Sequence, residues 1–204
     1  MGKRIVGLCC LSVCFLFVMS SCATPPPRWG AVWKDENYRG GYMKKVFVIG
    51  AARQEKVRVV FENEFVNQLK AHGTDAVASD TVIRFEKMMD KELVASKIKE
   101  SGCDSVLITR VLYVTTADQY KPMPKPNWNE FYSESYGYSQ APAGPRTTMG
   151  KFDARLEMKL FDTKSEQPVW SASAQMLVED DPRDEIKLFV RTLMEKLAAD
   201  KFIR

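Results

Sequence analysis

The sequence predicts an α/β fold, a sandwich with a mixed sheet and a C-terminal antiparallel hairpin. Two observations predict it. Short β-branched runs alternate with amphipathic helical segments from residue 45 to residue 116, and two strictly alternating runs precede a final helix after residue 150. Segments in that order bury their apolar faces when the helices cover a sheet. The expected order is β-α-β-α-β, a long loop, then β-β-α, in two or three layers.

The first half of the domain supplies three strands and two helices. Lys45-VFVIGAA reads as a buried strand, residues 75–83 as a second, and the run from Cys103 to residue 116 as a third. A helix over residues 90–101 is expected between the second and third strands. The helix expected over 55–71 ends at Gly73, a residue suited to a left-handed cap, and it has one apolar face: Val57, Val60, Phe61, Phe65 and Leu69.

The second half predicts a hairpin followed by a helix. Apolar residues alternate with Asp153, Arg155, Glu157 and Lys159, which predicts a strand with one buried face and one solvated face. A second alternating run begins at Pro168 and includes Trp170, Ala172, Ala174, Met176 and Val178. The last helix should begin near Pro182, because proline suits the first helical turn, and its buried face comprises Ile186, Phe189, Val190, Leu193 and Leu197.

Residues 117–150 are predicted to form a long loop rich in tyrosine and proline. A loop of that length is uncommon inside a domain and is often functional or disordered. Aromatic residues mixed with serine and glycine are typical of binding surfaces. The candidate partner-binding residues are therefore Trp128, Phe131, Tyr132, Tyr136 and Tyr138. A self-packed loop and insertion into a membrane as part of an oligomeric pore are the alternatives, and Glu130 and Glu134 argue against insertion.

The first 21 residues have the pattern of an export signal. Lys3 and Arg4 precede an uncharged apolar run, Ile5 to Met19, which is shorter than the roughly 20 residues of a membrane-spanning helix. The boundary Met19-Ser20-Ser21-Cys22 resembles the lipobox of bacterial lipoproteins, although Met19 stands where leucine is commonest. The resemblance implies that Cys22 receives a diacylglycerol and an N-acyl chain after cleavage. An uncleaved signal anchor and an ordinary secretory peptide are the alternatives.

Residues 22–44 are predicted to be a lipidated tether, because they are rich in proline, glycine and polar residues. Trp29 and Trp33 could dock on the domain or lie at the membrane surface. Residues 45–204 then form a single α/β periplasmic domain. Of the five cysteines, Cys103 would be the only free thiol of the mature chain, and we expect it to be buried.

The composition offers little for catalysis or for nucleic-acid binding. The single histidine, His72, is expected to be a solvated residue at a helix end, and one histidine with one thiol cannot build the usual metal site. Carboxylate pairs such as Glu62 with Glu64 are expected on polar faces. The formal net charge of +4 is too small to indicate nucleic acid. We therefore expect no enzyme activity, no metal and no cofactor other than the covalent lipid.

The body of the chain resembles the domain shared by the N-terminal part of TolB, the curli-secretion channel lipoprotein and the lipoprotein activator of penicillin-binding proteins. The similar segments are Lys45-VFVIGAA, Ala76-VASDTVI, Gly102-CDSVLITRV and the hairpin Leu160-FDTKSEQPVWSASA. This resemblance covers about residues 45–200 and rests on short motifs. It implies a periplasmic role in protein binding or assembly, and it transfers no catalytic residue.

The expected function is that of a non-enzymatic outer-membrane lipoprotein on the periplasmic face, held by its lipid and binding an envelope protein. Ala23 follows the lipidated cysteine, whereas Asp at that place commonly marks inner-membrane retention. The alternatives are an oligomeric structural or secretion component that uses the 117–150 loop, and an envelope hydrolase.

Overall fold

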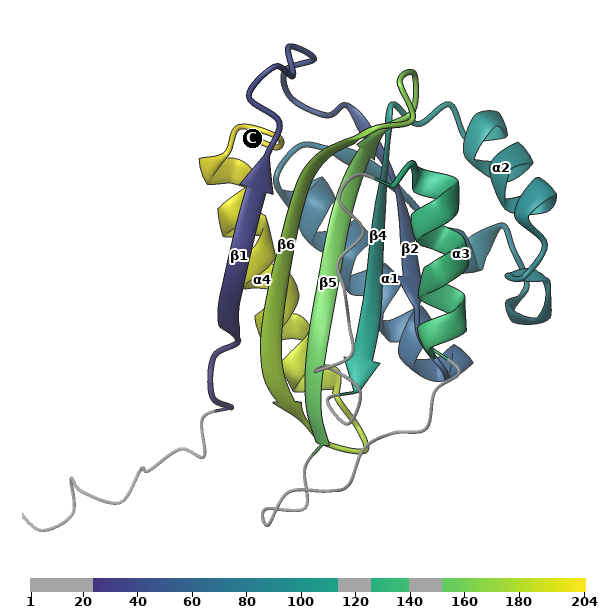
Figure 1. Cartoon of the computed structure of the whole chain (residues 1–204). Helices are drawn as coiled ribbons and strands as arrows, with labels where there is room; N and C mark the ends of the chain where they lie inside the picture. The colour runs from purple at the N-terminus through teal and green to yellow at the C-terminus, as the bar shows by residue number, and fades with distance from the viewer. Residues whose placement is uncertain (1–23, 114–125, 140–151) are drawn as a thin grey trace, which may run out of the picture.

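Six strands form one mixed sheet with the order β1-β6-β5-β4-β2-β3. The structure is a computed structural model that describes residues 24–113, 126–139 and 152–204 (Figure 1). β2 runs parallel to β3 and β4, whereas β5 is antiparallel to β4, and β6 to β5 and β1. The predicted α/β class with a mixed sheet is confirmed. The strands are β1 (Arg28–Lys34), β2 (Lys45–Ala51), β3 (Asp75–Ala78), β4 (Ser105–Tyr113), β5 (Phe152–Asp162) and β6 (Pro168–Val178).

Helices cover both faces of this sheet and make three layers. α1 (Glu55–Ala71) and α4 (Arg183–Ala199) lie behind the sheet in Figure 1, whereas α3 (Trp128–Ser139) lies in front of it and α2 (Lys91–Glu100) beside it. Two short 3₁₀ turns, Ser79–Thr81 and Phe85–Lys87, connect β3 to α2. In the described part of the chain, no helix combines the length and the apolar character needed to cross a membrane.

Two hydrophobic cores follow from the alternation of side chains along β2. Val46 and Val48 face the core shared with α1 and α4, while Phe47 and Ile49 face the core shared with α2 and α3. Successive residues of a strand point to opposite faces of the sheet, so a central strand covered on both sides is apolar throughout. This explains the continuous apolar run that predicted a buried strand.

The predicted C-terminal hairpin is present, with its inner face packed on α4. Met158 pairs with Ala172, and Leu160 pairs with Trp170. Trp170 is fully buried, and its indole Nε1 donates a hydrogen bond to Asp200 Oδ2 at 2.8 Å. The ring therefore fills the core while its polar nitrogen is satisfied at the end of the last helix.

The predicted tether is wrong for residues 28–34, because they form the edge strand β1 on β6. Proline and glycine around this segment suggested a linker, yet its aromatic residue finds a site on the domain. Trp29 stacks on Phe189 of α4 with 5.7 Å between ring centroids, and Lys196 Nζ lies 4.8 Å from the indole centroid. Of the two alternatives, docking on the domain and lying at the membrane surface, Trp29 is found docked on the domain.

The predicted loop at 117–150 is wrong for residues 128–139, which form α3. Asn127 Oδ1 accepts from the Glu130 amide at 2.9 Å, while Glu130 Oε2 accepts from the Asn127 amide at 3.0 Å. This reciprocal capping box starts the helix. The remaining parts of the predicted loop, 117–125 and 140–150, lie outside the described residues.

α3 also explains why part of the predicted polar face of β5 is buried. Glu157 is 8% exposed and Lys159 is 6% exposed, although the alternation predicted both to be solvated. The sequence showed the alternation but not the helix that covers this face. The second predicted strand is likewise shorter than expected, because β3 ends at Ala78 and a 3₁₀ turn follows.

Candidate functional site

The aromatic residues predicted to contact a partner lie in the second core. Phe131 and Tyr132 are 0% and 1% exposed, and Trp128 and Tyr136 are also buried. Their spacing along the chain brings them to one face of α3, so the predicted extended arm with an aromatic side is wrong. The side chain of Tyr138 and all of Cys22 lie outside the part that the structure describes. The buried rings cannot serve as an exposed binding surface while α3 lies on the sheet.

A buried charged cluster holds α3 in place. Arg110 Nη1 donates to Glu134 Oε2 at 2.8 Å, and its Nε donates to Glu157 Oε2 at 2.9 Å. The Arg110 guanidinium lies 4.5 Å from the Phe131 centroid, and Lys159 Nζ lies 4.8 Å from the same centroid. Burial lowers the pKa of Lys159, which the neighbouring Glu157 partly opposes. The cluster joins β4, β5 and α3 and is structural.

A second buried ion pair lies on the first turns of α1. Glu62 is 0% exposed, and its Oε1 accepts from Gly50 N at 2.9 Å, Arg58 Nε at 3.0 Å and Ser79 Oγ at 2.6 Å. Its Oε2 accepts from Asp80 N at 2.7 Å. Burial raises the pKa of Glu62 against the opposing effect of Arg58. The predicted solvated position of Glu62 is wrong, and four donors leave its carboxylate fully engaged.

His72 and Cys103 both lie at positions where they contribute to the fold. His72 is the C-cap of α1, and its Nδ1 lies 2.8 Å from the Arg204 carbonyl oxygen. Cys103 is buried as predicted, and burial raises the pKa of its thiol. No group of three or more histidine, cysteine or acidic residues in the described chain could hold a metal ion.

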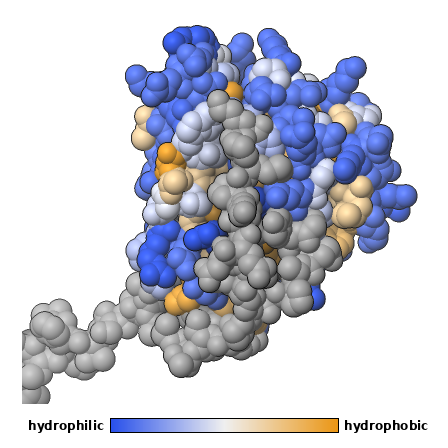
Figure 2. Space-filling model, in the orientation of Figure 1, coloured by the Kyte–Doolittle hydropathy of each residue, from blue (hydrophilic) through white to orange (hydrophobic). Residues whose placement is uncertain are grey.

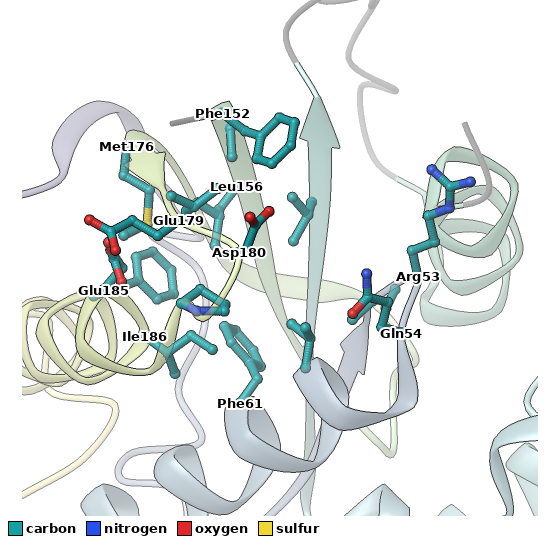
Figure 3. A pocket seen from close by; sticks show the side chains of 18 residues that line it. Arg53, Gln54, Phe61, Phe152, Leu156, Met176, Glu179, Asp180, Glu185 and Ile186 are labelled. Carbon is teal, nitrogen blue, oxygen red and sulfur yellow. The ribbon is translucent and has the colours of Figure 1, made fainter. Parts of the chain in front are cut away.

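The strongest candidate site is a pocket at the end of the sheet where the parallel strands β2 and β4 finish. Its cavity volume is about 200 Å³. In open α/β sheets, ligands commonly bind beyond the carboxyl ends of the strands. The walls come from β2, β4, β5, β6, α1 and α4, and Figure 3 shows Phe61, Leu156, Met176 and Ile186 directed around the cavity.

The polar groups of the pocket lie at its rim. Both helices begin there: Gln54 is the N-cap of α1 and Pro182 is the N-cap of α4, and neither makes a side-chain capping bond. Arg53 and Gln54 lie across the cavity from Glu179 and Glu185, with Asp180 between them (Figure 3). The described part of the lining therefore combines an apolar body with three carboxylates and one guanidinium.

Glu185 differs from the other acidic residues of the rim because it is buried. It is 3% exposed, and it is the third residue of α4. An acidic residue at this position commonly accepts from the amide of the N-cap residue. The N-cap here is Pro182, which has no amide hydrogen. The carboxylate has no hydrogen bond or ion pair with any residue that the structure describes.

Sequence reasoning missed this pocket, although signals for part of it were present. Gly50-Ala51-Ala52 ends the first buried strand with small residues, and Asp180-Asp181-Pro182 starts the last helix. Neither signal shows that the two helix starts meet, because that follows from the strand order. The described residues that line the pocket include no serine, threonine, cysteine, histidine or lysine. The site is suited to binding an apolar group and to contacting a donor at its rim.

Comparison with known proteins gives distant structural likeness only. No family model matches the chain, and no curated protein matches it. The chain is similar to a variant of the PelC dodecamer from Paraburkholderia phytofirmans, with 13% identity and a TM-score of 0.46, covering 85% of this chain and 99% of that one. A second PelC dodecamer structure from the same organism has 11% identity and a TM-score of 0.45, covering 80% and 94%.

Proposed function

We propose that this chain is a lipid-anchored protein of the bacterial envelope that binds a partner protein in the pocket between α1 and α4. The lipobox-like sequence ending at Cys22 supports the anchor and the outer-membrane, periplasm-facing location. The single observation that carries the binding role is the apolar cavity at the end of the sheet, bounded by two helix N-termini. Its volume of about 200 Å³ is below the roughly 300–1,000 Å³ of sites for drug-sized ligands. It suits one side chain of a larger partner.

Binding fits the lining better than hydrolysis does. A covalent hydrolase places a nucleophile beside a base, and the described lining residues offer carboxylates without a hydroxyl or thiol nucleophile. A pair of carboxylates can hydrolyse a glycosidic bond. However, walls formed by Phe61, Leu156 and Met176 would leave sugar hydroxyls without partners. We therefore propose that the envelope lipoprotein is non-enzymatic.

Site-specific crosslinking in the producing cell tests this function. A photo-crosslinking phenylalanine at Gln54, an exposed residue of the rim, should give an adduct of defined mass. The same group at Glu92, exposed on α2, is the matched control and should not give it. Val57→Trp, which narrows the cavity, should abolish the adduct, whereas Val82→Trp on an exposed position should not. An adduct that survives Val57→Trp in a folded protein would contradict the proposal.

Self-association through β1 is a second candidate. β1 is an edge strand of the sheet, and its residue Val32 is 43% exposed. A free strand edge can pair with another chain. Light scattering of the full chain in detergent should then show an oligomer that Val32→Lys reduces to a monomer, because an edge lysine opposes strand pairing. Val82→Lys, at an exposed position outside the sheet, should leave the oligomer intact. A monomer in the unaltered protein would exclude this candidate.

A further inference from the structure

We infer that the group bound in the pocket is an arginine side chain of the partner protein, with its guanidinium on the Glu185 carboxylate; this rests on the proposed binding function. The buried carboxylate carries the inference. Of the described polar side chains that line the cavity, Glu185 is buried at 3% exposure, whereas the others are exposed.

The position of Glu185 leaves its oxygens without the usual internal donor. A glutamate at the third position of a helix normally caps the preceding amide, which Pro182 does not have. The described residues offer no other hydrogen bond or ion pair to it. Glu185 is 3% exposed, and its carboxylate oxygens keep that small exposure at the cavity that the residue lines. A cationic donor entering the cavity would satisfy this carboxylate.

The first turn of α4 keeps this carboxylate suited to a cation. The positive end of a helix dipole favours a negative charge within that turn. However, the dipole supplies no hydrogen bond that would occupy both carboxylate oxygens. The Glu185 carboxylate is therefore available to accept hydrogen bonds from a group that enters the cavity.

The remaining lining matches the rest of an arginine side chain. Val57, Phe61 and Ile186 provide apolar walls for the methylene stem, which long cationic side chains commonly bury. Glu179 lies on the side of Glu185, Arg53 lies across the cavity, and the Asp180 carboxylate lies between them (Figure 3). Among the described lining residues, the buried Glu185 carboxylate is the acceptor that would favour a cationic side chain over an acidic one.

Arginine fits this geometry better than lysine does. Its planar guanidinium can donate two parallel hydrogen bonds to one carboxylate. Arginine is also enriched at protein interfaces, where lysine is depleted. The guanidinium is less strongly hydrated than an ammonium group, so its transfer into a small cavity is easier.

Titration calorimetry with short peptides tests this inference on the full chain in detergent. The probes are acetylated and amidated pentapeptides of four alanines around a central arginine, lysine, norleucine or glutamate. We expect the arginine peptide to bind at least tenfold more tightly than the norleucine peptide, and the glutamate peptide not to bind. Glu185→Gln should reduce the affinity for the arginine peptide at least tenfold and leave the affinity for the norleucine peptide unchanged.

Asp184→Asn is the matched control, because Asp184 is exposed in the same helical turn and does not line the cavity. It should change the affinity for the arginine peptide less than twofold. Thermal melting of both variants checks that the fold is intact. Equal binding of the arginine peptide by Glu185→Gln and by the unaltered protein would overturn the inference.

The peptides and the crosslinking experiment fail in distinguishable ways. If the norleucine peptide binds as tightly as the arginine peptide, the inference is wrong while the pocket remains a binding site for apolar groups. If no peptide binds but the Gln54 adduct forms and is lost in Val57→Trp, the arginine assignment is wrong and the proposed function stands. If no peptide binds and the Gln54 adduct does not form, both the arginine assignment and the proposed binding function are wrong.

Discussion

Arg110 and Glu157 are direct cross-strand partners on β4 and β5, and their side chains are joined by a hydrogen bond of 2.9 Å in the buried layer under α3. Removing Arg110 takes this donor from the buried Glu157 carboxylate, and Lys159 Nζ, 3.6 Å from Glu157 Oε1, does not replace its hydrogen bond. Arg110→Met should therefore lower the free energy of unfolding by about 3–5 kcal/mol, measured by urea denaturation followed by circular dichroism.

The double variant Arg110→Met with Glu157→Met is the control for that change. It removes both partners of the 2.9 Å hydrogen bond, so we expect it to recover part of the lost stability, although the buried Lys159, whose Nζ lies 3.6 Å from Glu157 Oε1, then loses that carboxylate. If the double variant is less stable than Arg110→Met, the pair is not the source of the loss. Glu134 is partly exposed and can be solvated in either variant.

Glu185 should be replaceable with a gain in stability, because its side chain is buried and no hydrogen bond or ion pair to a described residue offsets that burial. Glu185→Leu should raise the free energy of unfolding by about 1 kcal/mol, since loss of the desolvation cost outweighs loss of a favourable helix-dipole contact. Urea denaturation measures the change. Glu195→Leu, at an exposed position of the same helix, should stay within about 0.5 kcal/mol of the unaltered protein. A destabilised Glu185→Leu would indicate that this carboxylate has a structural role.

Local sequence patterns predicted much of the fold. Alternation in residues 152–162 and 168–178 predicted both strands of the hairpin, and Pro182 marked the start of the last helix. These features depend on interactions between near neighbours. The α/β class followed from their order, because each amphipathic face requires an apolar partner.

The missed features depend on contacts between distant segments. Trp29 belongs to β1 because Phe189, far along the chain, provides a surface for its ring. Glu157 is buried because α3 returns across the sheet, which no alternation within β5 can reveal. The capping box Asn127-Trp-Asn-Glu130 was a local signal for α3, but the surrounding prolines and glycines obscured it. The pocket required the strand order, which brings two helix starts together.

Tyr132 and Tyr136 should make stability fall at high pH. Burial raises the pKa of both phenols above their ordinary value of 10.0. A pKa that is higher in the folded than in the unfolded protein gives stability that is complete below pH 10 and is lost as the pH rises above it. The free energy of unfolding should therefore decrease as the pH is raised from about 8 to about 11, which is about one unit above the pKa of a free phenol.

Replacing both rings by phenylalanine separates this effect from other high-pH changes. Tyr132→Phe with Tyr136→Phe should flatten the decrease above pH 10, although loss of the Tyr132 hydrogen bond to the Met88 carbonyl oxygen lowers stability at neutral pH. Free tyrosine ionises near pH 10. Absorbance in the phenolate band at about 295 nm therefore reports the pH at which these rings ionise. An unchanged pH profile in the double variant would contradict the assignment.

Trp29 should anchor β1 to the domain. Trp29→Ala removes the stack on Phe189 and the contact with Lys196, so we expect a loss of about 1–3 kcal/mol. Trypsin should then cut faster at Arg28, the first residue of the strand, and at Arg39, beyond its end. Val32→Ala, at an exposed site of the same strand, should change neither stability nor cleavage appreciably. Equal cleavage rates in the two variants would mean that the strand does not depend on this ring.

Cys22 should determine where the protein resides. Cys22→Ala removes the thiol that would accept the diacylglycerol, so the chain should lose the lipid mass and the envelope-membrane fraction should lose the processed form. Each buried methylene of an acyl chain contributes about 0.8 kcal/mol to membrane binding, so loss of the chains should abolish stable anchoring. Mass spectrometry and membrane fractionation measure both effects, and globomycin, which blocks the lipoprotein signal peptidase, should make the unprocessed form accumulate.

Cys103→Ala is the matched control for Cys22→Ala, because Cys103 is a buried thiol of the domain and its replacement should leave processing unchanged. An unaltered mass and unaltered partitioning in Cys22→Ala would show that the anchor lies elsewhere.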